Sequence, residues 1–178
     1  VVGAGKRTPT FKQVKALEEF AVQRRDQNKK RKEFLETNPS DEDIESYDKA
    51  NPPWIHPNTK SSRVTVDDKQ LEKSKQYLKD KMGEKKYKAF MTKLANSGGW
   101  QRGGFKYTVE EREQRASELL RLYLENGGRC VVTGEKVKLS EIDPDHRIPI
   151  SKGSDPERNK ELDNPKNNID LITSNING

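Results

Sequence analysis

Cysteine and long apolar runs are almost missing from this 178-residue sequence. The single cysteine, Cys130, permits no internal disulfide, and no zinc site can rest on several thiolates. No stretch approaches the roughly 20 apolar residues that a membrane-spanning helix requires, and the N-terminus lacks the apolar core of a signal peptide. These absences argue against a disulfide-stabilised secreted domain and an integral membrane protein, and we expect an intracellular, cytoplasmic protein.

Apolar residues are also few overall, since 29% of the chain is hydrophobic and 36% is charged. Such a composition limits the size of a single core and favours a compact module with elongated, solvated helices. The predicted fold class is α+β, with a mostly helical, basic N-terminal region and a small C-terminal module.

The net charge of +6 is unevenly distributed. Residues 1–108 hold 24 Lys and Arg against 15 Asp and Glu, whereas residues 109–178 hold 11 against 14. A basic region joined to a mildly acidic module suggests that the basic part binds a polyanion such as DNA. Lysine-rich helices that are merely soluble would give a similar pattern, so composition alone leaves both interpretations open.

Capping signals divide the N-terminal half into helices. Thr10 with Gln13 has capping-box spacing and predicts a helix to about residue 35, and Ser40 after Pro39 predicts a second helix over 41–49. We therefore predict a basic helical arm over residues 1–50. Its candidate phosphate-binding residues are clustered cations: Arg24, Arg25, Lys29, Lys30, Arg31 and Lys32.

Three further regions follow the predicted arm. Residues 51–64 contain three prolines and predict an irregular linker, and residues 65–107 predict a Lys-rich helical region that starts near Thr65 with Asp68 at the capping position and is interrupted at Gly83. Within it, residues 97–104 are expected to be flexible and to form the best domain boundary. Arg102 and Lys106, beside aromatic residues, are candidates for contact with a nucleic acid backbone.

Residues 108–178 form the predicted C-terminal module. Thr108 with Glu111 predicts a capped helix that ends near Asn126, and the apolar segments around 130–132 and 137–139 predict a short hairpin. A strand-like run from Ile142 then carries the adjacent pair Asp145-His146. If residues 169–177 are helical, Asn177 lies near the end of that helix.

The order of these residues resembles the HNH nucleases, whose fold is the ββα-metal module. The matching positions are Asp145-His146, Pro149, Ser151, Asn168, Leu171 and Asn177. The spacing is most similar to that of the HNH domain of Cas9-type enzymes, and residues 128–134 resemble the family's knuckle before the first strand. The resemblance covers about residues 127–178.

The resemblance implies a metal-dependent DNA endonuclease. It assigns His146 as the general base, Asn168 as the residue that helps to orient it, and Asp145 and Asn177 as ligands of one divalent cation. Asp143 is a candidate second ligand, with a turn carboxylate before Pro144 as the equal alternative. Oxygen ligands favour Mg²⁺ or Mn²⁺. Arg147 and Lys152 are further candidates for contact with double-stranded DNA.

The sequence departs from the family pattern in three respects. Cys130 stands without the cysteine pairs that hold zinc in many members, so we expect no structural zinc and a buried, apolar role for this residue. The last motif position is Asn177 instead of histidine, which favours a hard metal. Family members usually continue the helix after this point, so a truncated helix end with weakened metal affinity is one expectation.

Several versions of this function remain open. A freestanding homing-type or phage-type enzyme of bacterial or phage origin fits the size, as does a fragment of a larger nuclease. A non-catalytic DNA-binding protein on an HNH scaffold is the alternative from another class, and an RNA-binding helical protein is more distant. The sequence predicts neither the recognition site nor the oligomeric state.

Overall fold

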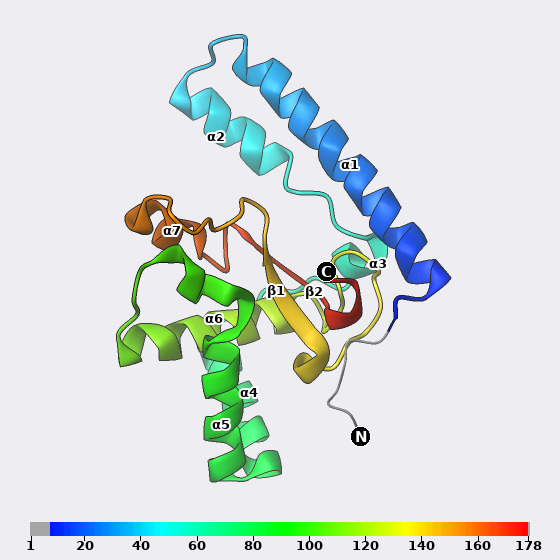
Figure 1. Ribbon diagram of the computed structural model, residues 1–178. Coiled ribbons are helices and arrows are strands. Elements are labelled where there is room, and N and C mark those ends of the chain that lie inside the picture. Colours follow the sequence, from blue (N-terminus) through cyan, green and yellow to red (C-terminus); the bar gives the residue numbers. More distant parts are fainter. Residues whose placement is uncertain (1–7, 178) are drawn as a thin grey trace.

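The protein is described here by a computed structural model, which describes residues 8–177, so the first seven residues of the predicted arm lie outside it. The fold is α+β, predominantly helical with one small sheet (Figure 1). The helices are α1 (Phe11–Leu35), α2 (Asp41–Ala50), α3 (Pro57–Ser61), α4 (Asp68–Met82), α5 (Glu84–Ala95), α6 (Val109–Glu125) and α7 (Pro156–Leu162). The strands are β1 (Ile142–His146) and β2 (Ile169–Thr173), and short 3-10 helices are η1 (Ser97–Gly103), η2 (Leu139–Glu141) and η3 (Ser174–Ile176).

Helices α1 and α2 form an arm that projects from the body of the molecule (Figure 1). The predicted capping box at Thr10 and Gln13 is confirmed, because each side chain bonds the other residue's backbone N–H. The two helices are joined by an ion pair between Arg31 and Asp48 at 2.7 Å and by stacked rings of Phe34 and Tyr47. The arm is therefore held together mainly by exposed and half-buried side chains.

Helices α4 and α5 pack as a pair against α6. The start of α4 differs slightly from the prediction, because Asp67 is the N-cap and pairs with Gln70, where Thr65 and Asp68 were expected. Gly83, with φ of 85°, separates α4 from α5 as the sequence predicted. The capping box of Thr108 at the start of α6 is also confirmed.

The glycine-rich segment that we expected to be a flexible boundary is instead the 3-10 helix η1, which lies against β1. Trp100 is buried there and its indole N–H donates to the Ala95 carbonyl at 2.9 Å. Trp100 also packs against the rings of Phe105 and Tyr107. This aromatic cluster gives the segment a small core of its own, which the glycine content concealed.

Strands β1 and β2 pair antiparallel, with Asp145 opposite Asp170 and His146 opposite Ile169. The predicted strand at 142–146 is confirmed, whereas the helix expected over residues 169–177 is wrong. Every residue of β2 is buried, and a short, continuously buried run with β-branched residues suits a strand as well as a helix face. Only the single turn η3 follows β2 before Asn177.

The hairpin expected over residues 130–139 is present only as a tight turn. Within residues 8–177 it contributes one isolated bridge, Arg129 to Lys136, and no regular strand. Gly134 takes a positive φ of 70° at its tip. Cys130 is fully buried, as predicted, and its Sγ accepts weak hydrogen bonds from the backbone N–H groups of Thr133 and Thr173.

The main core lies where α6, the turn after it and β2 meet. Its most completely buried apolar side chains are Leu119, Leu120, Cys130, Val132, Ile169 and Leu171. Burial of each large aliphatic side chain stabilises the fold by about 1.5–3 kcal/mol, so this cluster fixes β2 and, through pairing, β1. Across residues 8–177, no helix combines the length and apolar character needed to cross a membrane.

Candidate active site

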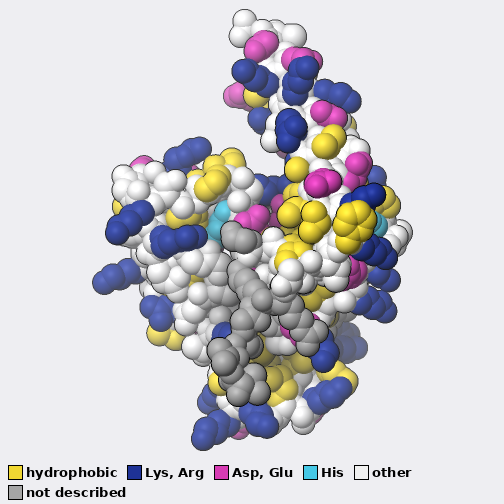
Figure 2. Space-filling view, turned by 45° about the vertical axis from the view of Figure 1, so that its right-hand side comes forward, with side chains coloured by type: hydrophobic (Ala, Val, Ile, Leu, Met, Phe, Trp, Pro, Cys, Tyr) yellow, Lys and Arg dark blue, Asp and Glu magenta, His cyan; other side chains and the backbone are white. Residues whose placement is uncertain are grey.

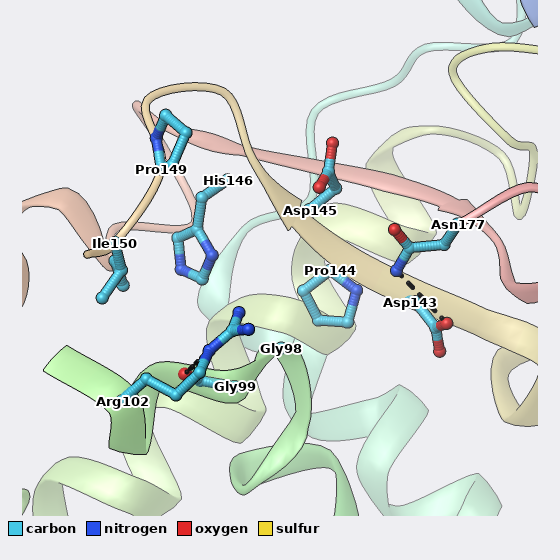
Figure 3. Close-up of a pocket in the computed structure, with 10 residues that line it drawn as sticks. All are labelled: Gly98, Gly99, Arg102, Asp143, Pro144, Asp145, His146, Pro149, Ile150 and Asn177. Atoms are coloured by element: carbon cyan, nitrogen blue, oxygen red, sulfur yellow. Dashed lines mark hydrogen bonds between the residues drawn. The ribbon is translucent and has the colours of Figure 1, made fainter. Parts of the chain in front are cut away.

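One pocket of about 410 Å³ gathers most of the chemically important residues predicted from the sequence (Figure 3). It is lined by residues of η1, of β1 and of the chain after each strand: Gly98, Gly99, Arg102, Asp143, Pro144, Asp145, His146, Pro149, Ile150 and Asn177. Thus four predicted site residues and one predicted DNA contact lie around one cavity, although they come from positions as far apart as 102 and 177.

Strand alternation places the two candidate metal ligands of β1 on one face. Asp143 and Asp145 are two residues apart in the strand, so their side chains project to the same side. The Asn177 amide nitrogen donates to Asp143 Oδ2 at 3.4 Å, and the Asn177 side-chain oxygen points to the side of Asp145 (Figure 3). The predicted helix is not needed for this arrangement, because η3 turns the chain back towards β1.

The donor chemistry of these three side chains fits a hard divalent cation. Two carboxylates and one amide oxygen are ligands that suit Mg²⁺ or Mn²⁺, which commonly retain several water ligands. A group of three or more His, Cys, Asp or Glu side chains arranged for a metal is not found among residues 8–177, so a cation here would depend on Asn177 and water. We therefore treat Asp143, Asp145 and Asn177 as a partial ligand set.

The electrostatic environment of Asp145 is unlike that of an ordinary surface carboxylate. Although the side chain reaches solvent, partial desolvation by the surrounding protein and the facing Asp170 carboxylate raise the pKa of Asp145. His146 and Arg24 act in the opposite direction. A carboxylate that is poorly compensated by nearby cations is well suited to attract one.

His146 forms a hydrogen bond that the sequence did not predict. Its Nε2 lies 2.8 Å from Oδ1 of Asp163, which follows α7, and Asp163 is also paired with Arg115 of α6 through Nε at 2.7 Å and Nη2 at 2.9 Å. The Tyr107 hydroxyl donates to the same carboxylate. Asp163 was missed because it is one acidic residue among several in a polar segment, and its partners are distant in sequence.

Buried ionic contacts dominate this network. The side chain of Asp163 is fully buried and that of Arg115 is 3% exposed. Burial by itself raises the pKa of Asp163, but hydrogen bonds from His146 and Arg115 outweigh it and lower that pKa to about 2. Burial and the Asp163 carboxylate raise the pKa of the Tyr107 hydroxyl. Asp163 is therefore an anion at neutral pH.

Asn168, predicted to help orient the histidine, braces the backbone beside it. Its amide nitrogen donates to the carbonyls of Ile148 and Leu162, and its Oδ1 accepts from the Ile148 N–H at 2.9 Å. Ile148 lies two residues after His146, and Leu162 directly precedes Asp163. Asn168 thus ties together the two segments that carry the hydrogen-bonded pair.

The predicted DNA-binding residues fall into two groups. Arg24 and Arg147 both bond Asp170, and Arg24 also donates to the Trp54 carbonyl, so these guanidinium groups are committed to internal contacts. Arg31 pairs with Asp48. The exposed cations are Arg25, Lys29, Lys30, Lys32, Arg102, Lys106 and Lys152. Contact of either group with DNA stays a prediction.

The exposed cations of the arm are interspersed with acidic side chains (Figure 2). Arg102 differs from them because its guanidinium points into the pocket on the side of His146 (Figure 3). Its Nε also donates to the Gly99 carbonyl at 3.3 Å, which limits its directions. The pocket therefore combines an acidic side at β1 with one cation from η1.

Comparison with models of protein families, with curated proteins and with solved structures found no match to this chain.

Proposed function

We propose that the protein is a metal-dependent endonuclease of the HNH type that hydrolyses phosphodiester bonds in double-stranded DNA. The observation that carries this proposal is the pocket in which Asp143, Asp145 and Asn177 lie beside His146. Oxygen donors next to a buried, hydrogen-bonded imidazole are the groups that such hydrolysis requires.

In this proposal His146 is the general base. It accepts a proton from a water molecule, whose oxygen forms a bond to phosphorus while the bond from phosphorus to the 3′ oxygen breaks. Asp143, Asp145 and Asn177 would hold Mg²⁺ or Mn²⁺, which when bound stabilises negative charge on the phosphate and on the departing oxygen. Arg102, at the opposite side of the pocket, supplies a positive charge for the phosphate backbone.

The basic arm supplies binding in this proposal. Exposed lysines and arginines of α1 and of the segments after η1 and β1 attract the phosphates without selecting a base sequence. Arg24 has a different part, since its pair with Asp170 anchors α1 to β2. The arm is thereby fixed to the strand that faces the pocket strand.

Cleavage of supercoiled plasmid tests the proposal. The wild type with Mg²⁺ should give nicked or linear DNA, whereas EDTA and His146→Ala should each abolish conversion. His56→Ala is the matched control, because His56 is the chain's other histidine and caps α3 away from the pocket. Circular dichroism of each variant verifies folding.

Two outcomes would contradict the catalytic proposal. Cleavage that persists in His146→Ala would remove the assigned base. Absence of cleavage by the folded wild type with Mg²⁺ and with Mn²⁺, together with a duplex shift in a gel, would favour the non-catalytic DNA-binding alternative.

A further inference from the structure

We infer that Asp163 is a positioning residue that holds His146 in the tautomer with its proton on Nε2, leaving Nδ1 to accept a proton from the pocket side. The part of this inference that concerns cleavage rests on the proposed nuclease function. The tautomer itself does not, since it follows from the contacts of a buried carboxylate with its four donors.

Asp163 has no capacity to donate to the histidine. Its Oδ1 accepts from Arg115 Nη2 at 2.9 Å and contacts His146 Nε2 at 2.8 Å, while Oδ2 accepts from Arg115 Nε and the Tyr107 hydroxyl. Each carboxylate oxygen thus has two partners, and an ionised carboxylate is only an acceptor. The hydrogen between Nε2 and Oδ1 must therefore belong to the imidazole.

The surrounding structure leaves the pair little freedom to rearrange. Arg115 Nη1 also donates to the Ala95 carbonyl at 2.9 Å, so the guanidinium is held between the end of α5 and Asp163. Asn168 fixes the chain next to both His146 and Asp163 through Ile148 and Leu162. The His146 side chain is 7% exposed. A ring flip would leave buried polar groups without partners, which costs about 1–3 kcal/mol for each group.

A purely structural role for Asp163 is the competing explanation, and the substitution Asp163→Asn separates the two. If the oxygen of the introduced amide keeps the bonds from Arg115 Nε and Tyr107, its NH₂ group meets Nε2 and needs an acceptor there. The ring can provide one only by moving its proton to Nδ1. The substitution therefore preserves shape and reverses the tautomer, which a merely structural role would not produce.

The test is a long-range ¹H–¹⁵N spectrum of protein labelled at histidine, recorded at a pH where the imidazoles are neutral. The chain has two histidines, so His56→Ala assigns the signals of His146. The wild type should show the proton on Nε2 of His146, and Asp163→Asn should shift population to the Nδ1-protonated form. In plasmid cleavage, Asp163→Asn should lower kcat about 100-fold or more with little change in KM.

Tyr107→Phe is the matched control. It removes a hydrogen bond to Oδ2 of the same buried carboxylate but leaves the Oδ1 contact with His146, so the tautomer and kcat should stay within about twofold of the wild type. If Asp163→Asn does not fold, the wild-type spectrum still decides the tautomer.

Different results overturn the two proposals. A wild-type His146 with its proton on Nδ1, or an Asp163→Asn protein whose tautomer and kcat match the wild type, would overturn the role of Asp163. A wild type with the expected tautomer that does not cut DNA would overturn the nuclease function and leave the tautomer assignment standing.

Discussion

Asp145 of β1 lies opposite Asp170 of β2, and two arginines hold the Asp170 carboxylate. Arg24 forms two hydrogen bonds to Asp170 at 3.0 and 3.2 Å, and Arg147 Nε lies 3.1 Å from it. Two facing carboxylates would repel each other, so these ion pairs stabilise β2 beside an acidic pocket. They also connect the arm to the site.

Asp170→Asn should therefore destabilise the protein substantially. The substitution leaves two largely buried guanidinium groups with a neutral partner, and loss of one member of a buried pair costs about 3–5 kcal/mol. Because Arg147 is partly exposed, we expect about 2–3 kcal/mol in urea denaturation. Asp48→Asn is the matched control: its pair with Arg31 is about half-exposed, so the loss should stay below about 1 kcal/mol. Equal losses in the two variants would contradict this account.

Gly98→Ala should weaken both the fold and the proposed activity. Gly98 has φ of 84°, and an added Cβ would lie 3.2 Å from Arg115 Nη2 and 3.2 Å from Pro144 Cβ. Beyond the backbone cost of about 1 kcal/mol, the methyl group must push β1 away from η1 and disturb the pocket. Urea denaturation and plasmid cleavage measure the two effects.

Gly83→Ala provides the control for backbone strain alone. Gly83 has nearly the same φ, 85°, but no atom lies within 4 Å of an added Cβ. It should therefore lose stability by about 1 kcal/mol and cleave DNA at the wild-type rate. If Gly98→Ala behaves in the same way, the contact between η1 and β1 has no influence on the pocket.

Local signals in the sequence were sufficient for much of the fold. Capping boxes at Thr10 and Thr108 and the breaks at Pro39 and Gly83 act within a few residues, so their effects can be predicted without knowledge of the tertiary structure. The strand at 142–146 was predicted for the same reason. Residues 169–173 were mistaken for a helix because their burial on both faces comes from packing that no local pattern reveals.

The candidate site was predictable to a similar extent. Asp143, Asp145 and His146 are close in sequence, and the resemblance added Asn177, which the structure brings to the same pocket. Asp163 was not predictable because its contacts with His146 and Arg115 span 17 and 48 residues. A lone acidic residue carries no mark of such contacts until the chain is folded.

Acid should remove a specific contribution of Asp163 to stability. Its folded-state pKa of about 2 lies below the ordinary value of 3.8, so the ionised group stabilises the fold above about pH 4. The shift corresponds to about 2 kcal/mol at neutral pH, which is lost as pH falls from about 4 to about 2. The difference in free energy of unfolding between wild type and Asp163→Asn should therefore shrink over that interval in urea denaturation. Other carboxylates titrate in both proteins, and a constant difference from about pH 7 to about pH 2.5 would contradict the prediction.

Chelation should separate folding from the proposed catalysis. Cys130 is the only cysteine, and its Sγ accepts two backbone hydrogen bonds inside the core, so the sequence and the packing favour a structure that folds without zinc. EDTA should abolish plasmid cleavage while it shifts the urea midpoint by less than about 0.2 M, roughly 0.2–0.6 kcal/mol. A large drop in the midpoint with EDTA, reversed by added Zn²⁺ and not by Mg²⁺, would reveal a structural zinc.

Removal of two arm lysines should change the salt dependence of DNA binding in a countable way. Lys29 and Lys30 are exposed on α1, and each phosphate contact contributes about −0.9 to the slope of log K against log salt concentration. Lys29→Gln with Lys30→Gln should therefore make the slope shallower by about 2, measured by fluorescence anisotropy in EDTA so that the duplex stays intact.

The same change of net charge can be made far from the arm. Lys85→Gln with Lys86→Gln alters two exposed lysines of α5, on the other side of the body from α1 (Figure 1). If the arm binds the phosphates, this control should lower affinity slightly and keep the wild-type slope, because charges beyond about 10 Å are largely screened at about 0.1 M salt. Equal changes of slope in the two double variants would mean that net charge, and not contact with the arm, attracts the DNA.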